Sequence, residues 1–276
     1  MVSGINNENM PIMNIVEDRN IALGDINWFT IQNTALLQVS KWASGHHDIV
    51  RQKVLPGKGF SIDISTYVIK TYVSFDEFML GKADFAGLID LMYRSIEKYR
   101  FSALYTAVMS LDSYLPGDMK ADLPITEAGK DSIIEFCEKV RATTGKDVML
   151  VGTRVAMQKL QNTVNYNMWS DQMKNERHLN GLLGSWEGYD TLALHRINAE
   201  GTRDSIFTAN DNKKIYVFPI DPDFKPIKRI NSGDLEYFER GTDGSMQDRT
   251  MEAEIWYHEG IGIVIDELYG VITDNS

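Results

Sequence analysis

Histidines and close carboxylate pairs are the side chains of this 276-residue chain most able to carry metal or acid–base chemistry. His46 and His47 precede Asp48, but neighbouring residues of a strand point to opposite faces, which makes them poor joint ligands. His258-Glu259 has no second histidine at helical spacing, so the zinc-protease pattern is missing. No ligand cluster with metal spacing is present, and we expect no metal or other cofactor.

Acidic pairs could supply a general acid and a general base. The pairs are Asp76 with Glu77, Asp221 with Asp223, Glu252 with Glu254, and Asp266 with Glu267. The chain has 39 acidic residues, so such pairs arise by chance, and each is expected to be a solvated or intersubunit charge. A hydrolase whose site assembles from scattered carboxylates stays open as an alternative.

Other catalytic and ligand-binding patterns are weak. Cys137 lies on the apolar face of a predicted helix with Ile133 and Val140, where a small core residue is expected. There is no Gly-x-Ser-x-Gly elbow, and the glycine pairs lack the strand–turn–helix context of a phosphate loop. The five tryptophans do not alternate with basic residues, which favours packing over nucleic-acid stacking. We therefore expect no enzyme.

Composition narrows the classes of protein to which this chain could belong. The net charge is −11, whereas a domain that grips nucleic acid is usually basic. A container whose inner wall only faces DNA remains possible. The hydrophobic content of 43% suits one or two domains, and no apolar run reaches the roughly 18 residues of a membrane helix. No signal peptide is evident, so we expect a soluble protein made in the cytoplasm without a membrane partner.

The order of predicted elements is more informative than any motif. Residues 1–26 indicate an extended arm, and residues 27–74 a long antiparallel excursion with too few apolar residues for its own core. A helix is predicted over 84–111, with Asp84 near its start. A helix over 126–142, a strand over 147–152 and a helix begun by Thr153 then indicate a small α/β domain. The C-terminal part is rich in strands.

This order resembles the HK97-type major capsid protein of tailed phages. Residues 51–64 and 67–72 look like the extended E-loop, and residues 75–90 look like the entry to the spine helix. Residues 210–219 with 248–257 look like the end of the axial domain and the last peripheral strands. The resemblance implies an α+β fold with an N-terminal arm, a β-hairpin E-loop, a spine helix in a peripheral domain, and an α/β axial domain.

The implied domain boundaries divide the whole chain. They are 1–26 for the arm, 27–74 for the E-loop, 75–118 with 233–276 for the peripheral domain, and 119–232 for the axial domain. The resemblance also implies self-assembly, in the host cytoplasm, into an icosahedral head of pentamers and hexamers that encloses double-stranded DNA without reading its sequence. Scaffolding, portal and decoration proteins are the implied partners. An encapsulin-like nanocompartment shell is the alternative within the structural class.

The excursion over 27–74 needs a neighbouring surface, because a ribbon without a core is not stable alone. In the shell it would lie over an adjacent subunit. Its basic residues are candidates to pair with acidic residues next door, a type of contact that sets register more than it stabilises. The candidate intersubunit contacts are Arg51, Lys53 and Lys58 on the ribbon, with Asp76 and Glu77 on the neighbour.

Overall fold

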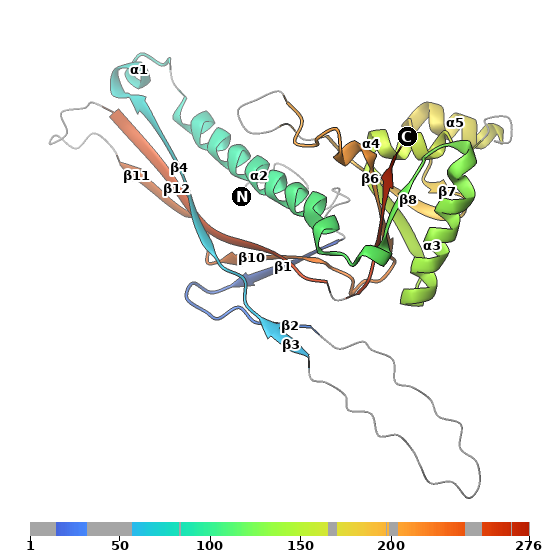
Figure 1. Ribbon diagram of the computed structural model, residues 1–276. Helices are drawn as coiled ribbons and strands as arrows, with labels where there is room; N and C mark the ends of the chain where they lie inside the picture. Colours follow the sequence, from blue (N-terminus) through green and yellow to red (C-terminus); the bar gives the residue numbers. More distant parts are fainter. Residues whose placement is uncertain are drawn as a thin grey trace, which may run out of the picture.

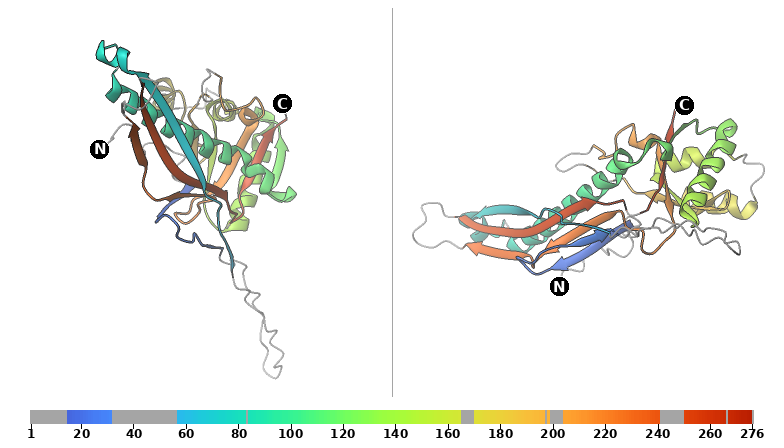
Figure 2. Two further views of the ribbon diagram at one scale, coloured as in Figure 1. Left: turned by 90° about the vertical axis from the view of Figure 1, so that its left-hand side faces the viewer. Right: turned by 60° about the horizontal axis from the view of Figure 1, so that its bottom comes forward.

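The computed structural model describes residues 15–31, 57–82, 84–164, 170–196, 198, 204–240, 250–265 and 267–275. These residues form a long helix over a five-stranded sheet, a six-stranded sheet flanked by helices, and a two-stranded ribbon (Figure 1). Two further views show the elongated outline, with the five-stranded sheet at one end and the six-stranded sheet at the other (Figure 2). In the described residues, no helix is long and apolar enough to cross a membrane.

The long helix predicted from the sequence is present. The helices are α1 (Phe75–Met79), α2 (Phe85–Ser110), α3 (Lys130–Thr144), α4 (Arg154–Gln161) and α5 (Asp171–Asn180). The Asp84 side chain caps α2 by accepting a hydrogen bond from the backbone N–H of Ala86, as expected. Thr153 caps α4 in the same way, and Gly145 ends α3 with a left-handed φ of 69°. The predicted starts at Asp84 and Thr153 are therefore confirmed, whereas the helix predicted over 126–142 runs from Lys130 to Thr144, after a short 3-10 turn.

The five-stranded sheet is organised around its longest strand, β12. Its members are β1 (Val16–Ile21), β4 (Ser65–Ser74), β10 (Ile227–Ser232), β11 (Glu236–Arg240) and β12 (Thr250–Ile263). β4 pairs with one edge of β12 over ten residues. β11 and β10 follow each other along the opposite edge, and β1 lies outside β10 in parallel. The C-terminal region, predicted to be rich in strands, thus contributes the longest strand of this sheet.

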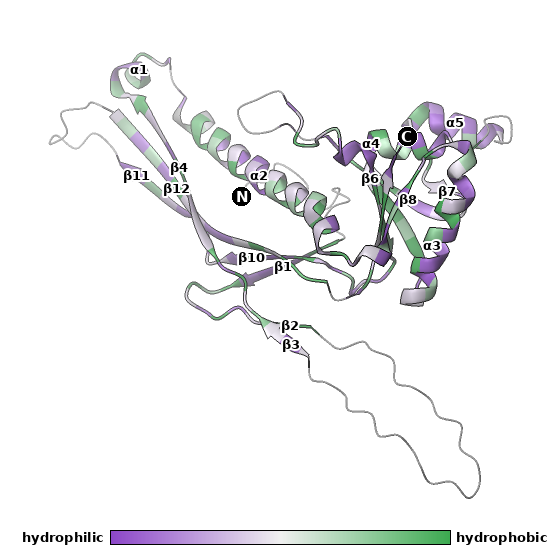
Figure 3. Ribbon diagram, viewed as in Figure 1, coloured by the Kyte–Doolittle hydropathy of each residue, from purple (hydrophilic) through white to green (hydrophobic). Residues whose placement is uncertain are grey.

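The six-stranded sheet has a buried centre. In spatial order its strands are β5 (Lys120–Leu123), β13 (Gly270–Asp274), β9 (Lys214–Pro219), β6 (Val148–Thr153), β8 (Tyr189–Leu194) and β7 (Ser185–Trp186). Helices α3 and α4 both pack on β6 and β9. β6 is almost uniformly hydrophobic in Figure 3, as expected for a strand that is buried on both faces. The predicted α/β unit over 126–161 is confirmed.

Several strands lie outside the divisions predicted from the sequence. β1 falls within the expected arm over 1–26, yet it is a strand of the five-stranded sheet. β4 falls within the expected excursion over 27–74, yet it also belongs to that sheet, because Tyr67 and Ile69 pack against α2. β10 joins the five-stranded sheet and β13 the six-stranded sheet, so the boundary at 232–233 does not separate the sheets. Within the segment that resembles the E-loop, residues 61–64 form no strand.

Helix α2 joins the two sheets because it contributes to both cores. Its first half places Met92 and Ile96 against Ala253, Ile255 and Tyr257 of β12. In its second half, Leu104 and Val108 are fully buried in the core of the six-stranded sheet. Two tyrosine hydroxyls donate hydrogen bonds at the C-terminal end of α2.

The Tyr216 hydroxyl donates to the carbonyl of Met109 at 3.1 Å, and the Tyr269 hydroxyl donates to that of Leu111 at 2.9 Å. These carbonyls are among those that a helix end leaves without partners. The C-terminal end of α2 is therefore fixed to the six-stranded sheet by hydrogen bonds as well as by packing.

A buried ion pair holds the middle of α2 to the five-stranded sheet. Arg100 donates from Nε to Glu259 Oε2 at 2.9 Å and from Nη2 to Asn231 Oδ1, also at 2.9 Å. Glu259 is only 3% exposed, and Arg229 Nε lies 4.0 Å from its other oxygen. The guanidinium of Arg100 also lies over the Tyr257 ring, 5.1 Å from its centroid. Removal of Arg100 would therefore leave a buried carboxylate with weak compensation.

Strand β1 is attached to β10 by charge as well as by its backbone ladder. Lys228 Nζ donates to Glu17 Oε2 at 2.6 Å, and Arg229 Nε donates to Asp18 Oδ1 at 3.0 Å. Partial burial raises the pKa of Glu17, but hydrogen bonds and charge from Lys228 and Arg19 outweigh it, so the pKa is below its usual value. Glu17 therefore favours its ionised form in the folded protein.

The first prediction concerns the buried ion pair. Arg100→Met should lower the free energy of unfolding by about 3 kcal/mol, because one partner of a buried pair is removed. Lys98→Met, at an exposed position of the same helix, should change it by less than about 0.5 kcal/mol. Denaturant unfolding of the purified chains gives both values, and equal effects at the two positions would contradict the assignment.

The second prediction concerns pH. A carboxylate with a lowered folded pKa contributes stability above its unfolded value, about 4.5, and this contribution is lost as the pH falls through the folded value. The wild type should therefore melt at a higher temperature than Glu17→Gln at pH 7, and the difference should shrink below about pH 4.5. Thermal melts across this range test it. A difference that does not depend on pH would exclude the ion pair as the cause.

Candidate intersubunit surfaces

The two-stranded ribbon lies apart from both larger sheets (Figure 1). β2 (Phe29–Ile31) and β3 (Lys58–Phe60) pair antiparallel and project from the face of the five-stranded sheet opposite α2 (Figure 1). Arg51 and Lys53, two of the predicted contact residues, lie outside the described residues. Lys58 is exposed on β3. One of the three predicted basic contacts can therefore be placed on the ribbon.

The predicted acidic contacts lie at the opposite end of the sheet from Lys58. Asp76 and Glu77 form the first turn of α1, which follows β4. β4 has ten residues, which at roughly 3.3 Å each span about 33 Å between the ribbon base and α1. Lys58 therefore cannot pair with these carboxylates in its own subunit, and any such pairing needs a second subunit.

Two exposed apolar groups flank these charges. Near the ribbon base, Leu23, Ile26 and Trp28 are 62%, 86% and 60% exposed. In and just after α1, Met79 and Leu80 are 67% and 69% exposed. Sequence reasoning did not identify either group, although the short apolar run after Glu77 was a usable signal. Large apolar side chains gathered at an extremity are typical of surfaces that meet a partner.

The face of the five-stranded sheet opposite α2 carries cross-strand ion pairs. Lys70 Nζ lies 2.7 Å from Glu252 and 2.8 Å from Glu254 across the β4–β12 ladder. The hydrogen bonds to Glu252 and Glu254 raise the pKa of Lys70, and the hydrogen bond from Lys70 lowers that of Glu254. Further along the ladder, the Thr66 hydroxyl and His258 Nδ1 are 2.8 Å apart. These groups are occupied within the subunit.

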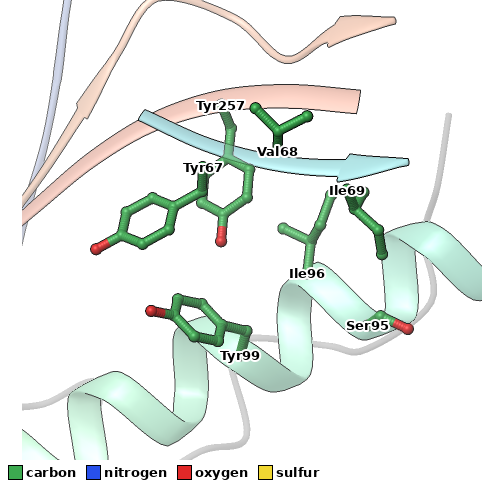
Figure 4. Close-up of a pocket in the computed structure, with 7 residues that line it drawn as sticks. All are labelled: Tyr67, Val68, Ile69, Ser95, Ile96, Tyr99 and Tyr257. Carbon is green, nitrogen blue, oxygen red and sulfur yellow. The ribbon is translucent and has the colours of Figure 1, made fainter. Parts of the chain in front are cut away.

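A cavity of about 220 Å³ lies between α2 and the five-stranded sheet (Figure 4). The residues that line it are Tyr67, Val68, Ile69, Ser95, Ile96, Tyr99 and Tyr257. The Tyr67 ring stacks on the Tyr257 ring with centroids 5.2 Å apart, and its centroid lies 5.3 Å from that of the tilted Tyr99 ring. Burial raises the pKa of Tyr257. The lining has no charged group, so it is suited to holding an apolar side chain and not to acid–base chemistry.

The remaining candidates for chemistry lie apart from one another. Cys137 is fully buried, and this burial raises the pKa of its thiol to about 12, which suits an inert core residue as predicted. Asp221 accepts a hydrogen bond from Lys146, which holds its pKa below the usual value. Among the described residues there is no group of three or more metal-ligating side chains. His46 and His47 lie outside the described residues.

Comparisons with known proteins agree with this architecture. The family model described as "SPbeta prophage-derived putative capsid protein YonB" matches residues 3–273. No curated protein sequence matches the chain. Three solved structures illustrate the fold, two from phages and one from an archaeal particle.

The "Asymmetric unit of bacteriophage PhiM1 mature capsid" has a TM-score of 0.67 at 11% identity and covers 100% of this chain and 90% of that chain. The "Capsid structure of the Cyanophage P-SCSP1u" has a TM-score of 0.64 at 14% identity, with 100% and 92% covered. The "virus-like particle from Pyrococcus furiosus" is less similar, with a TM-score of 0.50 at 14% identity and 96% and 93% covered.

At these identities the structural matches show the fold, which is the HK97-like α+β capsid fold expected from the order of elements. The family match extends over nearly the whole chain and indicates a structural protein, not an enzyme. The chain belongs to the YonB family of prophage-derived capsid proteins.

Proposed function

We propose that the chain is the major capsid protein of a tailed-phage head, which self-assembles into an icosahedral shell around double-stranded DNA. The observation that carries this proposal is the family match over residues 3–273. The exposed apolar groups at the ribbon base and at α1 support it, because a shell would cover surfaces that an isolated subunit leaves in water.

The proposed shell consists of pentamers and hexamers assembled in the host cytoplasm, with scaffolding, portal and decoration proteins as further partners. The net charge of −11 favours a wall that surrounds DNA over one that binds it tightly. An encapsulin-like compartment is the weaker alternative, since the two structures with TM-scores of 0.67 and 0.64 are phage capsids.

We also propose a domain division that follows the sheets. The E-loop consists of the ribbon strands β2 and β3 with the residues between them. The peripheral domain consists of α1, the first half of α2 and the five-stranded sheet, including β1 and β10. The axial domain consists of the six-stranded sheet, including β13, with α3, α4 and α5.

The ribbon charges offer a specific contact between copies. In this proposal Arg51, Lys53 and Lys58 of one subunit lie near Asp76 and Glu77 of the next. The support is geometric, because β4 separates Lys58 from α1 within one subunit. Exposed charges of this kind set register and association rate, and salt screens them.

Electron microscopy of the full-length protein tests the proposed function. After size-exclusion chromatography, negative staining should show icosahedral particles or ring-shaped capsomers. A sample that stays monomeric, with and without co-expressed neighbouring phage genes, would count against a shell subunit.

A charge-reversal set tests the ribbon contact. Arg51→Glu with Lys58→Glu should reduce the yield of regular particles, because two attractive contacts become repulsive. Adding Asp76→Lys with Glu77→Lys should restore the yield, since the charges are then exchanged. Arg94→Glu with Lys98→Glu, an equal change of charge at exposed positions of α2, is the matched control. Normal assembly of the first variant would exclude the pairing.

A further inference from the structure

The base of the ribbon is held to the body by a small set of contacts that its own two strands could not provide. β2 and β3 each have three residues, and an isolated two-stranded ribbon is marginal in water. The direction in which the ribbon leaves the body must therefore be set by what lies beneath it.

The side chain of Asn27 continues the hydrogen-bond pattern of β2 and β3 toward the five-stranded sheet. Following the register of β2 and β3 two steps inward places Asn27 opposite Ile62. The Asn27 Nδ2 donates to the Ile62 carbonyl at 2.7 Å, and the Ile62 N–H donates to Asn27 Oδ1 at 2.8 Å. A carboxamide presents a donor and an acceptor as a peptide group does, so one side chain replaces a backbone pair.

Ile62 in turn lies in a slot on β12. Gly260 is next to Glu259, which faces α2, so Gly260 faces the ribbon side of the sheet. A Cβ at Gly260 would lie 2.6 Å from the Asp63 carbonyl oxygen, and one at Gly262 would lie 2.7 Å from Ile62 Cδ1. Two glycines at alternate positions of one strand thus remove the side chains that would lift the ribbon base from the sheet.

Apolar side chains also pack between the ribbon base and the five-stranded sheet. Ile62, Phe29 and Ile230 form one buried cluster, and Ile230 is the cross-strand partner of Gly260. The Phe29 ring stacks on Phe60 across the ribbon with centroids 5.4 Å apart. The ribbon base is therefore packed against β10 and β12, while the two Asn27 hydrogen bonds join its two segments to each other.

We infer that Asn27, Gly260 and Gly262 are positioning residues that fix the direction of the ribbon in the free subunit, before a neighbouring copy is met. The inference rests on the proposed function, in which the ribbon reaches an adjacent subunit. A ribbon with a preset direction loses less conformational freedom on association than a loosely hinged one.

The test measures ribbon direction within one subunit. Spin labels on Lys58→Cys and Lys98→Cys, in full-length chain diluted with unlabelled protein, report the distance between the ribbon and α2. Cys137 is buried and should not label. The parent should give one narrow distance distribution.

Two variants should broaden or shift that distribution. Asn27→Leu removes both side-chain hydrogen bonds, and the Ile62 amide should exchange with solvent about tenfold faster. Gly260→Ala forces the backbone at Asp63 to move. Gly117→Ala is the matched control, because a Cβ there meets nothing within 4 Å. If Gly260→Ala fails to fold, Asn27→Leu still decides the question.

An unchanged distribution in a folded Asn27→Leu variant would overturn the inference. This readout is independent of assembly. If the parent chain never forms particles, the proposed function fails, while the distance measurement still shows whether these residues position the ribbon.

Discussion

The positions of α2 and of the ribbon both depend on strand β12, which has one of them on each face. Alternate residues of this strand point in opposite directions, so one set packs against α2 while the other faces the ribbon side. Ala253, Ile255 and Tyr257 meet the helix, followed by Glu259, which binds Arg100. On the other face lie the carboxylates that hold Lys70 and, further along, the glycine slot under the ribbon. A shift of register by one residue would exchange these two sets.

Helix α2 extends this constraint to the six-stranded sheet. Its 26 residues are long enough to take part in two cores, and Tyr216 and Tyr269 hold its C-terminal carbonyls. The ribbon, the five-stranded sheet and the six-stranded sheet are thus connected through one strand and one helix. For a shell subunit this means that contacts made at opposite ends of the molecule are geometrically related.

Charge has different roles inside the subunit and at its extremities. The ion pairs at Glu17, Asp18 and Glu259 hold the N-terminal strand and the long helix to the sheet. The side chains at the ribbon base and around α1 combine exposed apolar groups with a few charges. The first arrangement stabilises one subunit, and the second is suited to recognition between subunits.

Elements whose formation depends on neighbouring residues could be predicted from the sequence. The apolar periodicity of α2 and the caps at Asp84 and Thr153 are short-range effects, and the structure has them where they were expected. The order of these elements was enough to indicate the capsid fold, and the burial of Cys137 followed from its place on a helix face.

Which strands share a sheet could not be predicted in this way, because a strand's partner depends on residues that are distant in the sequence. A division by order alone therefore does not group β1, β4 and β13 with the sheets to which they belong. The separation between Lys58 and the carboxylates of Asp76 and Glu77 could not be predicted either, because it depends on the path of β4. Gly260 and Asn27 are far apart in the sequence, and their common role beneath the ribbon follows only from the contact each makes with the segment at Ile62 and Asp63.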